Sequence, residues 1–117
     1  MVRPKLRRLH SPDLQDPALP PDPRHCIVLV QAMVGPADGP GEESFDFSVV
    51  TPSYLQSQLG PRWGRGLLIV ESFDWEVVRA AVEERLSSAA RDTWDEVGLE
   101  LNKELCWEFD NYREYGR

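Results

Sequence analysis

The alternation of hydrophobic and polar residues along the chain predicts most of its strands. Residues 43–51 (ESFDFSVVT) place aromatic and aliphatic side chains on one side and serine and aspartate on the other, which is typical of a strand with one buried and one solvated face. Residues 2–9 alternate loosely among basic residues, as in a strand at the edge of a sheet. Residues 26–34 and 66–71 are hydrophobic on both sides, which predicts strands that are covered on both faces.

Three segments carry helix signals. Thr51 followed by Pro52 predicts a short helix to about Leu59, with the Thr51 hydroxyl capping its first turn. Asp74 caps a longer helix, and a third helix follows a break at residues 90–92. Hydrophobic residues recur at helical spacing in both: Trp75, Val78, Val82, Leu86 and Ala89 in the first, and Trp94, Val97, Leu101 and Leu105 in the second.

The order of these elements indicates the fold class. Five prolines within residues 10–24 predict a surface loop after the first strand. The elements then follow as strand, strand, strand, short helix, strand, helix, helix, strand. This order favours an α+β fold, with two to three helices packed on one face of an antiparallel or mixed sheet of about five strands. We expect residues 1–117 to form a single domain.

The charge of the chain narrows its range of partners. It has 13 basic and 20 acidic residues and a net charge of −7, which argues against nucleic acid as a partner and favours a basic protein. No hydrophobic run is long enough to cross a membrane, and the N-terminus lacks the hydrophobic stretch of a signal peptide. We therefore expect a cytoplasmic protein that binds neither nucleic acid nor membranes.

The residue types that catalysis or metal binding would need are not grouped. His25 and Cys26 are adjacent, so in a strand they would point to opposite faces and could not share a metal ion. The glycine-rich residues 60–66 lack the lysine and hydroxyl of a phosphate-binding loop. Cys26 and Cys106 are interpreted as buried thiols, although a disulfide between them stays open. The sequence thus predicts no enzyme, metal site or cofactor.

Acidic and aromatic residues outside the predicted core are the candidates for protein binding. Residues 106–112 alternate as a last strand, with Trp107 and Phe109 facing the core. Glu42 and Glu43 are interpreted as solvated charges in a loop. The candidate binding residues are those that the alternation or a loop places outward: Asp46, Trp63, Glu108, Asp110 and Tyr112. Tryptophan and tyrosine among them are favoured anchors in protein interfaces.

The order and spacing of certain residues resemble a known family. These residues are Ser11-Pro12-Asp13, Gly35, Glu43-Ser44-Phe45, Thr51-Pro52 with Leu55, Trp63-Gly64, Leu68-Ile69-Val70, Trp94, and Trp107-Glu108-Phe109 with Tyr112. Over roughly residues 4–112 the chain resembles the immunity protein 8 family of bacterial polymorphic toxin systems. The resemblance implies a small intracellular protein that neutralises a cognate toxin in a stoichiometric complex, without catalysis.

The acidic charge suits one kind of toxin in particular. A basic nuclease could be steered toward the chain by charge and covered at its nucleic-acid site. An acidic adaptor domain that binds proteins without toxin specificity is the alternative that composition and pattern leave open.

Overall fold

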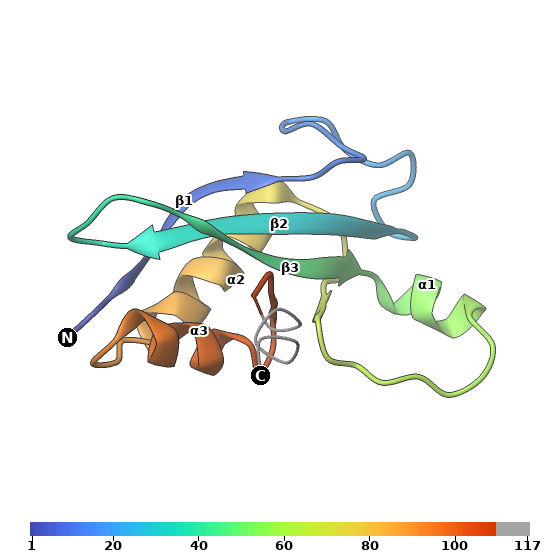
Figure 1. Ribbon diagram of the computed structural model, residues 1–117. Coiled ribbons are helices and arrows are strands. Elements are labelled where there is room, and N and C mark those ends of the chain that lie inside the picture. The colour runs from blue at the N-terminus through green and yellow to red at the C-terminus, as the bar shows by residue number, and fades with distance from the viewer. Residues whose placement is uncertain (110–117) are drawn as a thin grey trace.

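The computed structural model of the chain describes residues 1–109, which form a five-stranded sheet and three helices (Figure 1). The elements follow one another in the predicted order: β1 (Pro4–His10), β2 (Ile27–Pro36), β3 (Glu43–Val50), α1 (Pro52–Ser57), β4 (Leu67–Ile69), α2 (Trp75–Ser87), α3 (Trp94–Leu101) and β5 (Cys106–Trp107). The prediction of an α+β fold with a sheet of about five strands is confirmed.

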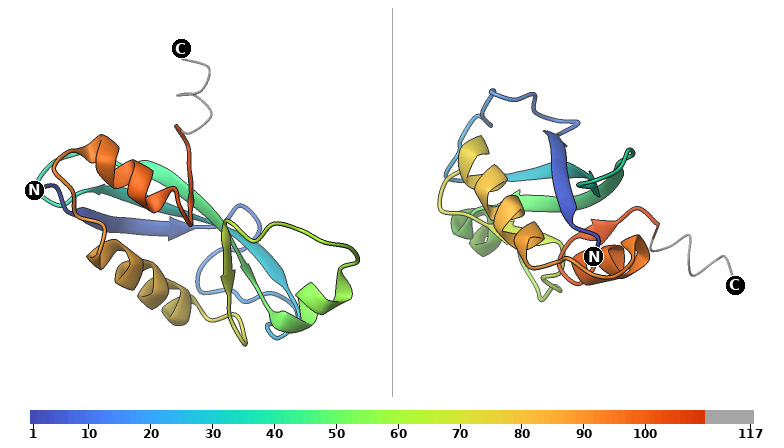
Figure 2. Two further views of the ribbon diagram at one scale, coloured as in Figure 1. Left: turned by 90° about the horizontal axis from the view of Figure 1, so that it is seen from below. Right: turned by 90° about the vertical axis from the view of Figure 1, so that its left-hand side faces the viewer.

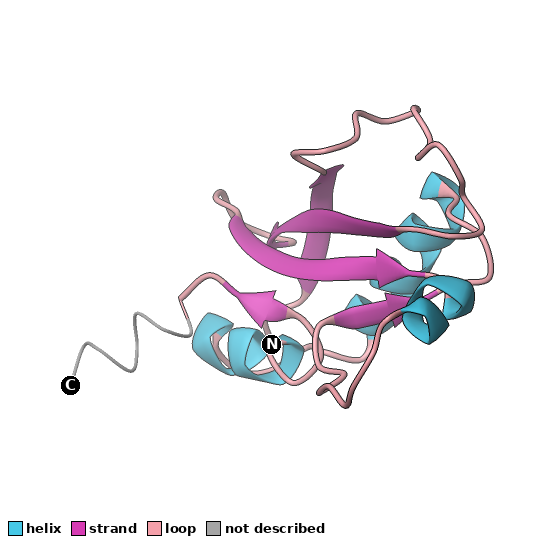
Figure 3. Cartoon of the chain, turned by 90° about the vertical axis from the view of Figure 1, so that its right-hand side faces the viewer, coloured by secondary structure: helices cyan, strands magenta, loops and turns pink. Residues whose placement is uncertain are grey.

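The sheet is mixed, with the strand order β1-β2-β3-β4. The first three strands pair antiparallel, whereas β4 runs parallel to β3. A parallel pair needs a long crossover connection. Residues 51–66, which include α1, form this connection. The short strand β5 also pairs with β3, through Phe45 opposite Trp107. Strands β4 and β5 therefore lie end to end along the same side of β3 (Figure 3).

Helices α2 and α3 lie against one face of this sheet, and the hydrophobic core fills the space between the two layers (Figure 2). The sheet contributes the side chains that alternation directs toward the helices, all at most 5% exposed: Val28, Val30, Ala32, Val34, Phe45, Phe47 and Val49. The helices contribute their predicted stripes, including Val78, Val82, Val97 and Leu101. The helical spacing in the sequence thus identified the buried side of both long helices.

The opposite side of the sheet, which we call the outer face, carries Ile27, Leu29, Gln31 and Met33 of β2, Ser44, Asp46 and Ser48 of β3, and Ile69 of β4. The prediction that β2 and β4 are covered on both faces is wrong. Ile27 is 41% exposed, Leu29 37% and Ile69 58%. Their side chains alternate along the strands with buried residues of the inner face.

All three helices begin where the sequence predicts, but the predicted side-chain cap of α1 does not form. Asp74 accepts a hydrogen bond from the backbone N–H of Glu76 at 2.9 Å and so caps α2. Thr51, the residue before α1, makes no capping hydrogen bond with its side chain. Its hydroxyl oxygen instead accepts a hydrogen bond from the backbone N–H of Cys26, at 3.0 Å. The hydroxyl therefore links the end of β3 to the start of β2 and does not cap α1.

The C-terminal strand is shorter than predicted. It comprises only Cys106–Trp107, whereas alternation extended it to residue 112. Phe109 is 36% exposed and packs edge-to-face on the Trp107 ring at a centroid distance of 6.0 Å, so it is not a core residue. The backbone of Glu108 remains attached to β3, because its N–H donates to the carbonyl of Ser44.

The two cysteines differ in environment. Cys26 is buried as predicted, whereas Cys106 is exposed, and both are free thiols. Burial, with a smaller contribution from the negative charge of Asp22, raises the pKa of the Cys26 thiol. The Cys26 thiol therefore stays protonated and acts as a small apolar side chain.

Candidate functional site

Two of the predicted binding residues, Asp46 and Glu108, lie together at one end of the outer face. Both contact Ser44: its hydroxyl donates to Asp46 Oδ1 at 2.5 Å, and its backbone N–H donates to Glu108 Oε1 at 2.5 Å. Strand β5 makes this possible, because its pairing with β3 delivers residue 108 beside the start of β3. The alternation of β3 thus correctly placed Asp46 outside the core, and the two carboxylates form a small acidic site.

The opposite end of the outer face carries aliphatic side chains in place of carboxylates. The register aligns Ile27, Val50 and Ile69 in one row across β2, β3 and β4. Leu29 lies two residues further along β2, beside Ser48 of β3. Val50, in the middle of this row, is fully buried, whereas Ile27 and Ile69 on either side of it are exposed. The outer face therefore has an apolar part at the end of β3 and an acidic part near its start.

The other predicted binding residues do not join this site. Trp63 is 95% exposed and lies in the connection between α1 and β4, which loops away from the sheet (Figure 1). Leu59 in the same connection is also 95% exposed. Asp110 and Tyr112 lie outside the described residues. Of the five candidates, the structure therefore brings Asp46 and Glu108 together and places Trp63 on a separate projection.

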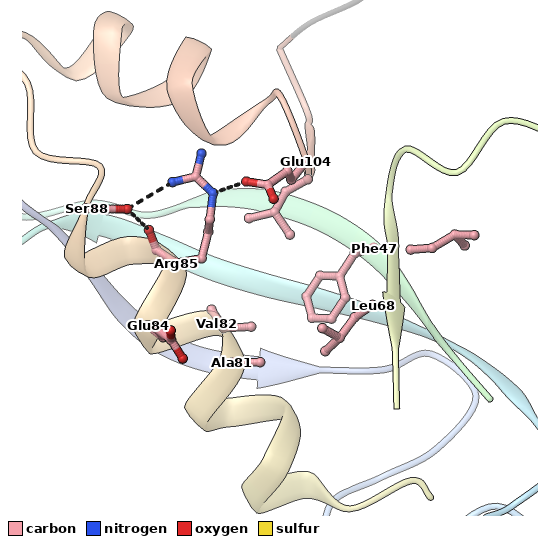
Figure 4. Close-up of a pocket in the computed structure, with 10 residues that line it drawn as sticks. Phe47, Leu68, Ala81, Val82, Glu84, Arg85, Ser88 and Glu104 are labelled. Atoms are coloured by element: carbon pink, nitrogen blue, oxygen red, sulfur yellow. Dashed lines mark hydrogen bonds and ion pairs between the residues drawn. The ribbon is translucent and has the colours of Figure 1, made fainter. Parts of the chain in front are cut away.

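A groove that the sequence did not predict runs between α2 and β4, with a volume of about 370 Å³ (Figure 4). Its floor is apolar and includes Phe47 of β3, Leu68 of β4 and Val82 of α2. Its rim is charged and includes Glu84 and Glu104. No local pattern in the sequence indicates this groove, because it depends on how far α2 lies from β4.

An ion-pair network on α2 and α3 borders the groove. Glu100 contacts Arg85 at 2.9 Å, Lys103 at 2.9 Å and Arg91 at 3.1 Å. Hydrogen bonds from Lys103 and Arg85 lower the pKa of Glu100 to about 2, and the charge of Arg91 acts in the same direction. Arg85 also pairs with Glu104 on the groove rim. The guanidinium group of Arg85, which lines the groove, thus pairs with two carboxylates.

Glu43 has a role that the sequence interpretation missed. It begins β3 in phase with Phe45, so its side chain turns toward the helices. Its Oε1 accepts hydrogen bonds from the indole N–H groups of Trp94 and Trp107, at 2.8 and 2.9 Å. Phe45 stacks on Trp107, with ring centroids 6.0 Å apart. Glu43 is therefore the polar partner of an aromatic cluster and not a solvated loop charge.

The histidines, cysteines and carboxylates of the described residues were also candidates for a metal site. Within residues 1–109, no cluster of three or more histidine, cysteine, aspartate or glutamate residues could hold a metal ion. His25 is exposed, and its Nδ1 lies 3.0 Å from the Ser53 hydroxyl. Among the helices described, none is long and apolar enough to span a membrane. What the structure offers is a set of surfaces: an outer face, a groove and an exposed connection.

Comparison with known proteins assigns a family to this small acidic α+β domain. The family model Immunity protein 8 matches residues 5–112, nearly the whole chain. The chain belongs to this family. Neither the curated proteins nor the solved structures include a significant match. The resemblance seen in the sequence is thereby confirmed at the level of the family.

Proposed function

We propose that this protein neutralises a cognate bacterial toxin by binding it in a stoichiometric complex in the cytoplasm, without catalysing a reaction. The observation that carries the proposal is the match of residues 5–112 to the Immunity protein 8 family. The absence of a metal-binding cluster within residues 1–109 is compatible with action by binding alone. Neutralisation then requires only that the complex cover or distort the site through which the toxin acts.

The outer face is the proposed contact surface. Ile27, Leu29 and Ile69 would be withdrawn from water there, at about 25 cal/mol for each Å² of apolar surface buried. Asp46 and Glu108 flank them with two carboxylates that already share Ser44 as a partner. An apolar centre with a polar margin is the usual composition of a protein interface. Trp63, Asp110 and Tyr112 are proposed as peripheral contacts.

The charge of the chain supports a basic toxin, such as a nuclease. A net charge of −7 would attract a basic partner during diffusion and raise the association rate. This attraction weakens as salt shortens the Debye length from about 30 Å at 0.01 M to about 8 Å at 0.15 M. We therefore expect the association rate constant to fall over this range of ionic strength. A rate that does not depend on salt would argue for an apolar interface without steering.

To test the proposal, the toxin encoded by the adjacent gene is expressed in bacteria with and without this protein, and survival of the cells is measured. Neutralisation predicts survival only when both are present, together with a one-to-one complex on size-exclusion chromatography. Equal killing in both cultures would remove the proposal. A complex that leaves killing unchanged would favour the alternative, an acidic adaptor domain without toxin specificity.

The proposed contact on the outer face is tested by reversing charges in this protein and measuring its binding to a catalytically inactive variant of the toxin. Asp46→Lys and Glu108→Lys should each raise the dissociation constant of the complex, measured by titration calorimetry. Glu83→Lys is the matched control, because it makes the same change of charge on an exposed position of α2. Equal weakening by all three variants would indicate only a general effect of net charge.

A further inference from the structure

The strand β4 is an edge strand with a free main-chain side. It ends the strand order of the sheet and pairs only with β3. The carbonyl of Gly66 accepts from Ser48 at 2.8 Å, and the N–H of Val70 donates to Val50 at 2.9 Å, so both groups point toward β3. Because main-chain groups alternate in direction along a strand, Leu67 and Ile69 point theirs away from β3. An edge of this kind can pair with an added strand.

The groove lies directly beside this free edge. Leu68 of β4 forms one wall, and Ala81 and Val82 of α2 form the other (Figure 4). The inner layer of the protein thus continues past the last strand, with apolar surface that no strand of the described residues covers. A strand added to β4 would place every second side chain on the inner side of the sheet. One of these side chains would enter the groove.

The rim of the groove favours a cationic side chain. The carboxylate of Glu84 forms no ion pair within the described residues. Arg85, the nearest basic group, is already paired with Glu100 and Glu104. Lysine and arginine combine an apolar stem with a charged end. Such a side chain would lay its stem on Leu68 and bring its charge to the rim.

We propose that the free edge of β4 pairs with an extended segment of the toxin, and that a lysine or arginine of this segment fills the groove. This inference rests on the proposed function. It specifies one contact through which the protein would bind the toxin. It extends the contact surface from the outer face around the edge of the sheet, because the side chain of Ile69 lies on the outer face while its main chain forms the edge.

Strand pairing at β4 is tested by substituting Ile69. The probe is a catalytically inactive variant of the toxin encoded by the adjacent gene. Ile69→Pro removes the outward N–H without removing an N–H that bonds to β3, and proline is tolerated at strand edges. We expect affinity to fall about tenfold, as for one lost hydrogen bond in an interface. Ile69→Ala is the matched control, because it shortens the side chain and keeps the N–H. Equal losses from both variants would overturn strand pairing at this edge.

The groove is tested at Glu84, which needs no change to the main chain. Glu84→Lys should weaken affinity by about fivefold, as expected for reversing one partly exposed charge pair. Its neighbour Glu83 does not line the groove, so Glu83→Lys should bind as the unaltered protein does. Equal effects of the two reversals would overturn the assignment of a cation to the groove.

Hydrogen exchange observes the pairing directly and does not depend on substitutions. In the complex, the amide of Ile69 should exchange more slowly than in the free protein. An unchanged exchange rate would overturn the proposal, even if the toxin binds. If the unaltered protein does not bind the adjacent toxin at all, it is the proposed function that fails. The two failures are therefore distinguishable.

Discussion

The two faces of β3 differ in how far their side chains are buried. Phe45 and Val49 are fully buried and Phe47 is 3% exposed, all on the side of the helices. Asp46 and Ser48, between them in sequence, are only half-buried and lie on the outer face. One strand thus supplies core and surface with alternate residues. A substitution at the buried Phe45 should therefore lower stability, whereas one at the half-buried Asp46 should leave stability nearly unchanged.

The two faces also differ in the kind of apolar residue they carry. The inner face uses aromatic rings in fixed geometry, with Phe45 stacked on Trp107 and edge-on to Trp94 at 6.4 Å. The outer face carries the aliphatic residues Ile27 and Ile69, which are 41% and 58% exposed. Rings packed in this way stabilise the fold, whereas exposed aliphatic side chains are available to a partner.

The largest effect is expected from removing a ring of the inner face. Trp107→Ala should lower the free energy of unfolding by about 3–5 kcal/mol, because Trp107 is 4% exposed and its removal leaves a cavity beside Phe45. Ile69→Ala on the outer face should change stability by about 0.5 kcal/mol or less. Urea denaturation of both variants measures the difference. Similar losses would break the division between the faces.

A smaller loss is expected when the polar partner of the rings is removed. Glu43→Leu leaves the indole N–H groups of Trp94 and Trp107 without their acceptor, at a cost of about 1–3 kcal/mol. Its neighbour Glu42, which pairs with Arg8 at the surface, provides the control. Glu42→Leu should stay within about 1 kcal/mol of the unaltered protein. If the two variants unfold at the same denaturant concentration, Glu43 is a surface charge after all.

The ion-pair network predicts a dependence of stability on pH. The pKa of Glu100 is lowered from 4.5 to about 2 in the folded protein. The contribution of Glu100 to stability is therefore complete above about pH 4.5 and is lost as pH falls toward 2. The difference in thermal midpoint between Glu100→Gln and the unaltered protein should shrink over this range. A constant difference would show that ionisation of Glu100 is not the cause.

The smallest effect on the fold is expected on the outer face. Asp46→Lys should leave the thermal midpoint nearly unchanged, within about 0.5 kcal/mol of stability, because the Asp46 side chain contacts only Ser44 among the hydrogen bonds described. The same variant should weaken binding of the toxin. A clear fall in the midpoint would instead assign Asp46 to the framework of the sheet.

Much of the fold could be predicted because its signals are local. The alternation of β3, the cap at Asp74 and the helical stripes each depend on residues a few positions apart. The exposed sides of β2 and β4 could not be predicted. An apolar side chain at Ile69 has the same pattern whether its cover comes from this chain or from a partner. Hydrophobicity therefore predicted burial where the structure has a free surface.

The candidate site was predictable only in part, for a related reason. Alternation placed Asp46 correctly, but the groove depends on how far α2 lies from β4, which no local pattern contains. The role of Glu43 depends on Trp94 and Trp107, which lie 51 and 64 residues away. Its phase with Phe45 was a usable signal, although the residue type argued for solvent. Position in a strand was the better guide there than residue type.

The isolation of Trp63 gives the protein an optical property. Trp75 and Trp107 are 5% and 4% exposed, whereas Trp63 is 95% exposed. A soluble quencher such as iodide would therefore extinguish the emission of Trp63 first and leave that of the buried indoles. Trp63→Phe would leave the emission of the buried Trp75 and Trp107 and of the half-buried Trp94. The unaltered chain would also report, without any added dye, whether an approaching molecule shields the connection between α1 and β4.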